Sequence, residues 1–565
     1  YNYWGTAPDN SAITYPASLV DISNYRNVAI NIPLGTTNFF VAPNGSDQNN
    51  GSKNKSWRTL SFAFTQIFAS ALDSLTIHLA PGIYSAVATG EKFPAYVKSN
   101  ITLLGAAPGP SQSAETIISG EGVSSRELLR LEDVSEVRIA HLKFRNIKLN
   151  AQAGAILGRK SSEIVIENCI FEDNQSQRGA AITFVDVRGA EIRNNIFRRN
   201  KSTNHGGALT LLEDNSVVTN NIFTENTATN GGGAVHCDSS SEARFTRNEF
   251  QKNAAGFGGA LYISRSTPRL NNNRILSNHA TVSSGGAIAL DGAALPLIGT
   301  REQQSNDIYL NTAVGKGSQV SRLDPGLKID TRYNFWGQIP DSTLLYPFAQ
   351  FAAENYRQVS ERMPVDTPEI YVSPTGDDNA TGVSHSDALR TIGQALRLSF
   401  GLVTSPVTLR LLPGRFAAAT NGEAFPVTLE SYCTLRGAGR DSTTVDAENR
   451  SRVFEGRNLA GSMITDLKIV GGKASGFGGA ILISNGKTAA AGKSVALAMT
   501  NCLLQNNSAT NGGAVATQRS YKTVIRNCEF ANNTTQQSGG AVAALGDSIE
   551  ISASEFYGNR AQTNG

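Results

Sequence analysis

The sequence predicts an all-β fold, a tandem array of right-handed parallel β-helix (solenoid) domains, each with a short N-terminal capping helix. Two short sequence motifs, called words below, alternate along residues 171–287, and each recurs every 25 to 27 residues. A fixed period of this length is typical of solenoids. Between the words, apolar and polar residues alternate as in half-buried strands. About 26 residues accommodate three short strands and three turns, which form one coil.

The first word is Phe-x-x-Asn, with Ile275–Asn278 as a weaker fifth copy. Coils stacked about 4.8 Å apart would bring each Phe over the previous one and each Asn amide beside the next. We therefore expect an internal aromatic stack and an asparagine ladder. The predicted ladder residues are Phe171, Asn174, Phe197, Asn200, Phe223, Asn226, Phe250, Asn253, Phe530, Asn533, Phe556 and Asn559.

The second word is a pair of small residues followed by an aliphatic residue, as in Gly233-Ala234-Val235. Glycine is favoured where a Cβ would clash or where φ must be positive. Each copy of this word predicts a tight corner of the coil.

Together, the words Phe-x-x-Asn and Gly-Gly-Ala-[Ile/Leu/Val] resemble the paired signature of the chlamydial polymorphic outer-membrane proteins and related bacterial surface β-helices. The resemblance implies a solenoid that acts as a secreted passenger or adhesin.

A longer repeat contains the coils. Residues Tyr1–Gly5 recur as Tyr333–Gly337, an offset of 332 residues that also relates Pro81-Gly82 to Pro413-Gly414. We therefore predict four regions: residues 1–37 as the end of a preceding repeat plus a linker, 38–337 as the first β-helix repeat, 338–368 as a linker, and 369–565 as a second repeat truncated at its C-terminus.

Each long repeat opens with a strand, an Asn/Asp-Gly loop, a helix and a further strand. Apolar residues at helical spacing predict the helices over Thr59–Leu72 and Thr391–Phe400. This order resembles the start of a widespread bacterial family of the pectin-lyase-like superfamily, in which the helix covers the open N-terminal end of the solenoid. An uncovered end would expose apolar core and unpaired strand edges.

The segments before Asn38 and Glu369 carry apolar residues that a free linker would not need, among them Leu344, Leu345 and Phe351. We expect each segment to pack on the end of one β-helix and on the cap of the next. The expected result is a rod of fixed domain orientation.

Composition excludes some function classes. A formal charge of +3, from 50 basic and 47 acidic residues, gives no electrostatic basis for nucleic-acid binding. No apolar run approaches the roughly 18 residues needed to cross a membrane. The chain starts without an initiator Met or signal peptide, so we expect a processed protein or a fragment.

The five cysteines do not form a disulfide framework. Cys169, Cys502 and Cys528 each follow Asn and lie two residues before Phe or Leu, so we expect them to occupy one slot of the coil. They are expected to be small buried core residues. Cys502 and Cys528, one coil apart, could also form a disulfide, because usual geometry requires Cα atoms within about 7 Å.

Catalytic motifs are not recognisable, and we expect no enzyme. The motifs of a polygalacturonase-like site are missing, and the adjacent pair Glu213-Asp214 does not provide two carboxylates on either side of a bond. His205, His236 and His279 lack metal-like partners and are interpreted as solvated or structural.

Two loops have the composition of calcium-binding loops. The loops 44–51 and 375–382 are rich in Asp, Asn and Gly, as calcium loops are, with Asp47 and Asp378 as the candidate ligands. The favoured alternative is an Asx-turn loop satisfied by its own backbone. We therefore expect no cofactor and no metal site.

The predicted function is a non-catalytic structural or adhesive repeat segment of a large secreted cell-surface or extracellular filament protein. The expected partners are neighbouring copies of the same repeat or protein, joined end to end or laterally, with glycans or a cell surface as further candidates. The alternative is a β-helix that binds or cleaves polysaccharide.

Overall fold

The computed structural model describes residues 2–3, 25–26, 36–67, 74–106, 115–122, 126–299, 305–358, 368–378, 380–399, 406–457, 459–484, 495–518, 522–545 and 548–563. The short strands β1 (Asn2–Tyr3) and β2 (Tyr25–Arg26) pair with each other in parallel. Most of the expected linker before Asn38, which includes the apolar residues Tyr15, Leu19, Val20 and Ile22, lies outside the described residues.

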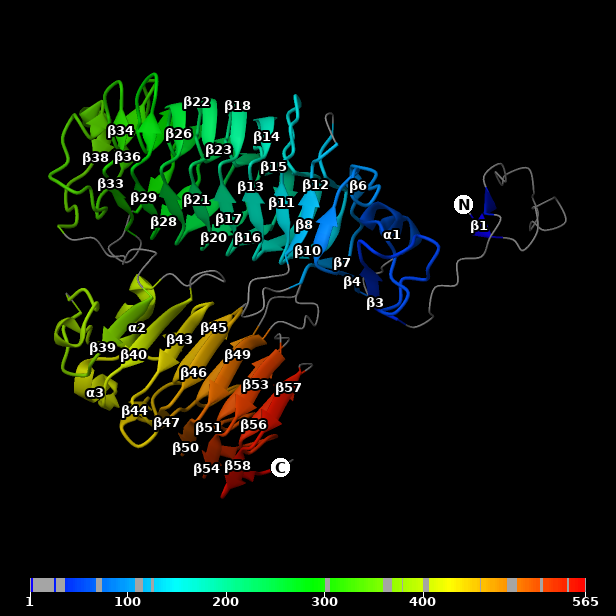
Figure 1. Ribbon diagram of the computed structural model, residues 1–565. Helices are drawn as coiled ribbons and strands as arrows, with labels where there is room; N and C mark the ends of the chain where they lie inside the picture. The colour runs from blue at the N-terminus through cyan, green and yellow to red at the C-terminus, as the bar shows by residue number, and fades with distance from the viewer. Residues whose placement is uncertain are drawn as a thin grey trace.

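The rest of the described chain forms two parallel β-solenoids (Figure 1). Every strand of a coil pairs in parallel with its counterpart in the next coil. This arrangement confirms the predicted fold class.

In the first solenoid, three faces run along its length. The first face contains β3 (Asn38–Val41), β4 (Leu75–Leu79), β7 (Ile101–Leu104), β10 (Ser135–Ala140), the second half of β12 (Ile156–Glu167), β16 (Glu191–Arg193), β20 (Val217–Thr219), β24 (Arg244–Thr246), β28 (Arg269–Asn271) and β32 (Leu297–Ile298). The second face contains β5 (Gly82–Tyr84), β8 (Thr116–Ser119), β11 (Lys143–Arg145), β13 (Ile170–Glu172), β17 (Ile196–Arg198), β21 (Ile222–Thr224), β25 (Glu249–Gln251), β29 (Arg274–Leu276) and β33 (Asp307–Tyr309).

The third face includes the first half of the long strand β12. It contains β6 (Ala95–Tyr96), β9 (Leu129–Glu132), β12, β15 (Ile182–Arg188), β19 (Leu209–Leu212), β23 (Val235–Asp238), β27 (Leu261–Ser264), β31 (Ile288–Asp291), β35 (Val320–Arg322) and β37 (Leu345–Tyr346). The middle coils add a fourth short strand that the sequence analysis did not predict: β14 (Gln175–Arg178), β18 (Lys201–His205), β22 (Thr227–Gly231), β26 (Ala254–Phe257), β30 (His279–Ala280) and β34 (Thr312–Ala313).

The second solenoid repeats this plan. Its first face contains β39 (Glu369–Val372), β40 (Val407–Leu411), β43 (Cys433–Arg436), β46 (Ser462–Thr465), β49 (Val495–Thr500), β53 (Lys522–Arg526) and β57 (Ile549–Ser552). Its second face contains β41 (Gly414–Phe416), β44 (Thr443–Asp446), β47 (Lys468–Val470), β50 (Leu503–Gln505), β54 (Glu529–Ala531) and β58 (Glu555–Tyr557). Its third face contains β42 (Val427–Thr428), β45 (Phe454–Arg457), β48 (Ile481–Ser484), β52 (Val515–Gln518) and β56 (Val542–Leu545). The additional short strands are β51 (Ser508–Ala509), β55 (Thr534–Thr535) and β59 (Arg560–Ala561).

Helices are few and short in the described chain. The two predicted helices are present as α1 (Leu60–Gln66) and α2 (Ile392–Leu398), each starting after a Thr N-cap and each ending earlier than expected. A one-turn helix α3 (Ala418–Asn421) and the 3-10 turns η3 (Phe348–Gln350) and η4 (His385–Asp387) are also present. Helix α1 lies against β6, and α2 lies against β39, β40 and β42. That these helices serve as caps stays a prediction.

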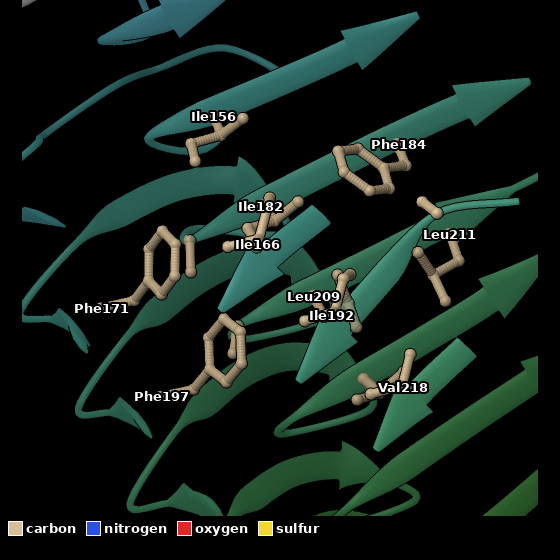
Figure 2. Packing of buried hydrophobic residues seen from close by; sticks show 14 of the residues in the cluster. Ile156, Ile166, Phe171, Ile182, Phe184, Ile192, Phe197, Leu209, Leu211 and Val218 are labelled. Atoms are coloured by element: carbon tan, nitrogen blue, oxygen red, sulfur yellow. The ribbon is translucent and has the colours of Figure 1, made fainter. Parts of the chain in front are cut away.

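One hydrophobic core runs through each solenoid. Figure 2 shows Phe171 and Phe197 in successive coils, facing the same interior as Ile166 and Ile192. The ring centroids of Phe171 and Phe197 are 4.9 Å apart, and the column continues through Phe223 and Phe250 at 4.6 and 4.8 Å. Burying one such side chain stabilises the fold by about 1.5–3 kcal/mol.

The column extends beyond the predicted residues. Phe144 stacks on Phe171 at 4.9 Å, and in the second solenoid Phe530 stacks on Phe556 at 4.7 Å. Phe556 is 47% exposed, because it lies in the last described coil.

The asparagines that follow the Phe column form a continuous ladder. Each Nδ2 donates to the Oδ1 of the next Asn, at 3.0 Å from Asn174 to Asn200 and 2.9 Å from Asn200 to Asn226. Asn226 continues to Asn253 at 3.0 Å, and Asn533 bonds to Asn559 at 2.9 Å.

A second asparagine ladder was missed by the sequence analysis. Each of its members lies two residues before a large buried apolar residue, which is Phe, Ile or Trp, and each Nδ2 donates to the next Oδ1 at 3.0 Å. Its residues are Asn195, Asn221, Asn248, Asn273, Asn306 and Asn334. The recurrence of Asn at this spacing was visible in the sequence.

Cysteine occupies the slot of this second ladder in other coils. Cys169 donates its backbone N–H to Asn195 Oδ1 at 2.9 Å, at the start of the ladder. In the second solenoid, Thr500 pairs with Arg526 and Leu503 with Glu529, so Cys502 and Cys528 share one register position. All five cysteines are buried and are free thiols in this structure.

The Gly-Gly-Ala corners need glycine for both expected reasons. Gly232 has φ +71°, a conformation that L side chains rarely adopt. A Cβ on Gly233 would lie 2.2 Å from the carbonyl oxygen of Gly259. The first glycine thus allows the turn and the second allows close stacking of the coils.

Two expectations about the junction differ from the structure. Part of the segment predicted as a linker completes the first solenoid, because β37 pairs with β35 and Leu345 is fully buried in its core. The expected end-to-end rod is also not observed. The second solenoid lies beside the first (Figure 1), and Arg247 and Glu430 join them at 2.6 Å.

Candidate functional site

The two candidate calcium ligands bind backbone at the start of the helices. Asp47 accepts hydrogen bonds from the N–H groups of Arg58 and Thr59, both at 2.9 Å, and from the Thr59 hydroxyl at 2.7 Å. Asp378 makes the same three bonds to Arg390 and Thr391. Both carboxylates therefore bind donors at a helix start 11 to 13 residues further along the chain, which differs from the expected Asx turn closed on its own loop. In the described part of the chain, no group of three or more His, Cys, Asp or Glu is arranged to hold a metal ion.

A second carboxylate supports each helix. Glu91 accepts from the N–H groups of Leu60 and Ser61 at 2.7 and 2.9 Å, and Glu423 accepts from those of Ile392 and Gly393 at 2.7 and 3.0 Å. Burial raises the pKa of both carboxyls, that of Glu423 to about 7, against these hydrogen bonds. These groups position helices α1 and α2.

The pair Glu213-Asp214 does not form a site. Glu213 is exposed, whereas Asp214 is 1% exposed and accepts the Ser216 N–H at 2.7 Å. Burial raises the pKa of Asp214 to about 7. The two carboxyls differ in environment and do not converge on one substrate position.

The histidines include both of the expected kinds, structural and solvated. His236 is 2% exposed, and its ring stacks on His205 at 4.8 Å and on Tyr262 at 5.2 Å. Burial lowers the pKa of His236 to about 3. Gly231 makes room for this cluster, because a Cβ there would lie 2.4 Å from the Phe257 ring.

Charged residues surround the cluster. Asp238 accepts two bonds from Arg265 at 2.9 and 2.7 Å, and Asp291 accepts the Tyr262 hydroxyl at 2.8 Å. Each carboxylate is thus bound by a neighbouring side chain. The rings of His205, His236 and Tyr262 stack on one another beside the third face. His279, by contrast, is exposed and bonds Thr312 Oγ1 at 2.8 Å.

The two solenoids meet along the first face of the first solenoid. Arg247 follows β24 and reaches across, donating to Glu430 at 2.6 Å and to the backbone carbonyl of Leu396 at 2.8 Å. The Tyr432 hydroxyl also donates to Asn168 Oδ1. These bonds join turns of the first solenoid to α2 and to the segment after β42.

A cleft of about 280 Å³ lies between the solenoids beside these bonds. On the first solenoid, it is lined by successive coils that contribute Glu191, Arg193, Asn194, Val217, Thr219, Asn220 and Arg247. On the second, it is lined by Thr428, Leu429, Glu430, Ser431, Arg457 and Leu459. The lining combines carboxylate, guanidinium, amide and hydroxyl groups, which are the groups that orient a polar ligand.

Asn194 has a buried side-chain acceptor in the wall of the cleft. Its side chain is 4% exposed, yet its Oδ1 accepts no hydrogen bond in the described structure. Leaving such a buried acceptor unsatisfied costs about 1–3 kcal/mol. A buried acceptor without a donor among the described residues therefore lies in the wall of the cleft.

Some charged side chains of the cleft lie in ion pairs and one, Arg457, does not among the described residues. Arg193 binds the carboxylate of Glu167 at 2.7 Å. Burial by itself raises the pKa of Glu167, but the charges of Arg138 and Arg193 outweigh this effect and lower the pKa to about 2. Arg247 pairs with Glu430. Arg457 is exposed and forms no ion pair with the residues that the structure describes. The cleft thus offers a guanidinium group to an anion.

No cleft residue was singled out from the sequence. Asn194 and Arg457 lie almost half the chain apart and carry no motif. Asn194 and Arg457 come together because the second solenoid lies beside the first. No local sequence pattern predicts that contact. In the described part of the chain, no helix has the length and apolar character needed to cross a membrane.

Comparisons with known proteins place the fold. Residues 128–301 match the family model described as a right-handed beta helix region, and residues 374–563 match a protein family of unknown function, DUF1565. No curated protein matches the chain.

Similar solved structures include tailspike protein 3 of bacteriophage CBA120, with 10% identity, a TM-score of 0.32 and 93% of this chain covered. The chain spans 61% of that tailspike. A rhamnogalacturonan lyase has 11% identity, coverage of 84% and 82% of the two chains and a TM-score of 0.26. A mannuronan C-5 epimerase A-module of Azotobacter vinelandii has 11% identity, coverage of 87% and 91% and a TM-score of 0.21. The family-model match and the parallel coils together identify a right-handed parallel β-helix protein.

Proposed function

We propose that this chain is a structural and adhesive segment of a secreted surface protein, and that it adheres by binding an acidic polysaccharide in the cleft between its two solenoids. The observation that carries the proposal is the pairing of a buried, unsatisfied acceptor, Asn194 Oδ1, with the exposed guanidinium of Arg457 in one cleft. A sugar hydroxyl would donate to the first, and a uronate carboxylate would bind the second.

The shape of the cleft supports a polymer rather than a small metabolite. Asn194 and Asn220 follow β16 and β20, which are neighbouring strands of adjacent coils. Side chains at equivalent positions of stacked coils lie about 4.8 Å apart. Successive sugars would therefore meet the equivalent amides of Asn194 and Asn220, one coil apart.

Binding without cleavage is the favoured interpretation of the chemistry. Glu430 is held by Arg247 at 2.6 Å, and Glu191 lies 3.6 Å from Arg193. Both carboxylates of the cleft therefore lie beside an arginine rather than standing as a free pair on either side of a bond. Cleavage of polysaccharide by this β-helix is the alternative.

The resemblance to chlamydial polymorphic outer-membrane protein passengers belongs to the same proposal. It is supported by the two repeated words and by the stacked coils that they build. A surface location and lateral or end-to-end association of copies follow from this proposal, and a calcium ion or other cofactor forms no part of it.

The test is calorimetric titration of the full chain with acidic and neutral oligosaccharides. We expect binding of oligouronides, a loss of about tenfold in affinity for Arg457→Ala, and a similar loss for Asn194→Gly, since each removed bond is worth about 1–2 kcal/mol. Glycine suits position 194 because Asn194 has φ +56°.

The matched control is Asn146→Gly, at an exposed turn residue with φ +59° outside the cleft, which should bind as the wild type does. Equal affinity of wild type and both cleft variants would contradict the proposal. New reducing ends or unsaturated products during incubation would favour the cleaving alternative.

A further inference from the structure

Two cysteines of the second solenoid lie next to each other in successive coils. Leu503 pairs with Glu529, so the residues just before them, Cys502 and Cys528, share one register position, and the Glu529 N–H donates to the Cys502 carbonyl at 2.8 Å. Equivalent Cα atoms of parallel strands lie about 4.8 Å apart, whereas a disulfide requires Cα atoms about 4.4 to 6.8 Å apart. The backbone spacing at this position is therefore that of a disulfide.

The two side chains also have the same orientation. Cys502 Sγ lies 3.3 Å from the carbonyl oxygen of Thr500, and Cys528 Sγ lies 3.3 Å from that of Arg526, in each case two residues earlier in the chain. The two thiols are in hydrogen-bond contact with each other. Their sulfur atoms are therefore neighbours in the structure.

The slot that these cysteines occupy belongs to an asparagine ladder in the first solenoid. The residue just before a second-face strand is Asn195 at β17 and Asn221 at β21, and their amides are bonded at 3.0 Å. In the second solenoid, the residues just before β47, β50, β54 and β58 are Leu467, Cys502, Cys528 and Ser554. None of these side chains is an amide, so this corner has no amide ladder between its coils.

We propose that Cys502 and Cys528 form an oxidation site that closes into a disulfide, which joins two coils of the second solenoid at the corner where the first solenoid uses asparagine. The structure shows the reduced form of the site, with both thiols free. The inference is independent of polysaccharide binding, because neither cysteine lines the cleft.

Hydrogen peroxide is the class of oxidant that suits the site, because it is small and Cys528 is only 2% exposed. The Cys528 thiolate attacks one peroxide oxygen, the O–O bond breaks, and the other oxygen leaves as water, so that Cys528 becomes a sulfenic acid. The Cys502 sulfur then attacks the sulfur of the sulfenic acid, the S–S bond forms, and the S–O bond breaks with release of a second water. Two thiols and one hydrogen peroxide thus give one disulfide and two water molecules.

The environment of the pair determines which cysteine reacts first. The hydrogen bond from the Cys502 thiol lowers the pKa of Cys528, whereas the same contact and burial raise the pKa of Cys502. The thiolate is the nucleophile in oxidation. Cys528 is therefore the residue that becomes a sulfenic acid, and Cys502 is the residue that resolves it.

The test is peptide mapping of the full folded chain after treatment with one equivalent of hydrogen peroxide, with the remaining thiols alkylated in denaturant. Trypsin cleaves after Arg526, so the peptides that contain Cys502 and Cys528 stay together only through a disulfide. We expect these joined peptides, with Cys169 and Cys237 recovered in alkylated form, and we expect reductant to separate the peptides.

Stability provides a second measurement. Positions 502 and 528 are 26 residues apart, and a disulfide that closes such a loop restricts the unfolded chain. The oxidised protein should therefore have a higher midpoint of thermal denaturation than the reduced protein.

Cys528→Ser is the test variant. Serine suits this slot because Ser554 occupies it one coil further, where its Oγ donates to the Ser552 carbonyl at 2.9 Å. The variant should fold, should give no joined peptides and should show no rise of the midpoint on peroxide treatment.

Cys169→Ser is the matched control, at the same slot of the first solenoid, where Cys169 Sγ lies 3.3 Å from the Glu167 carbonyl oxygen. Burial raises the pKa of Cys169 to about 12, so this variant should oxidise as the wild type does. Recovery of all five thiols from treated wild type, oxidation of Cys528 to a sulfinic or sulfonic acid without joined peptides, or a rise of the midpoint that persists in Cys528→Ser would overturn the proposal.

Discussion

Asn226 shows how one side chain joins three coils. Its Nδ2 donates to the Phe197 carbonyl at 2.9 Å and to Asn253 Oδ1 at 3.0 Å, while its Oδ1 accepts from the N–H and the Nδ2 of Asn200 at 3.1 and 2.9 Å. Asn226 is fully buried, so no water replaces these bonds if they are lost. The ladder is therefore a hydrogen-bonding device inside the solenoid wall.

The first prediction follows from these four bonds. Asn226→Leu should lower the free energy of unfolding by about 1–3 kcal/mol, because the neighbouring amides and carbonyl lose partners in an enclosed turn. The measurement is the midpoint of chemical denaturation. Asn230→Leu, at an exposed residue of the same coil, is the control, and an unchanged midpoint for Asn226→Leu would show that the ladder does not stabilise the fold.

Asp214 gives the chain a pH dependence. Burial raises its pKa from 3.8 to about 7, so between these pH values the folded state binds more protons than the unfolded state. This difference makes the contribution of Asp214 to stability fall as the pH rises from about 4 to about 7.

We therefore predict that Asp214→Asn gains stability relative to wild type by roughly 2–4 kcal/mol between pH 4 and pH 8, since each unit of pKa shift corresponds to about 1.4 kcal/mol. The asparagine keeps an acceptor for the Ser216 N–H. Unfolding curves at several pH values provide the measurement, with Glu213→Gln at the exposed neighbour as the control. A difference that stays constant with pH would contradict the prediction.

At the scale of elements, α1 depends on carboxylates that come from loops. Asp47 satisfies three donors at the helix start. Asp47→Ala should destabilise α1 and its contact with β6 by about 1–2 kcal/mol, as the loss of an N-terminal cap does. Faster hydrogen exchange over residues 58–66 would report this loss.

Calcium provides the discriminating measurement for the same element. If Asp47 and Asp378 are structural caps, the melting temperature of the wild type should not change between added calcium and added chelator. Gln48→Ala, at an exposed neighbour of Asp47, is the control for the exchange experiment. A rise in melting temperature with calcium, lost in Asp47→Ala, would establish a metal site instead.

The elements also show what a sequence can and cannot predict. Periodic words in the chain predicted the coil, because stacked parallel strands require the same residue type at each turn. The helix ends were less predictable, since α1 stops at Gln66 although apolar residues continue. The ladder through Asn195 and Asn221 was predictable in principle, because it recurs with the same period.

At the scale of the molecule, the relation between the solenoids could not be predicted from local pattern. The rod expectation assumed that the segment between the repeats packs both on the end of one β-helix and on the cap of the next. Instead, the segment after Gly337 closes the first solenoid with β37, and the second solenoid turns back beside it. The cleft and its candidate ligand-binding residues exist because of this contact between distant parts of the chain.

The contact rests on a charged pair that can be reversed. The side chains of Arg247 and Glu430 are each 19% exposed, so the pair is partly shielded from water. Removing one partner of such a pair typically costs about 2 kcal/mol or more, because the other charge stays partly desolvated. Glu430→Arg would in addition place two guanidinium groups together.

We therefore predict that Glu430→Arg separates the solenoids. Small-angle scattering should show a larger radius of gyration and a longer maximum dimension than for the wild type, whose distance distribution should be that of two solenoids side by side. The charge-reversed double variant Arg247→Glu/Glu430→Arg should return to the wild-type profile, because the pair is restored with opposite polarity. Lys328→Glu is the control for a charge change away from the contact. An extended profile for the wild type, or no recovery in the double variant, would mean that the Arg247–Glu430 pair does not hold the two solenoids together.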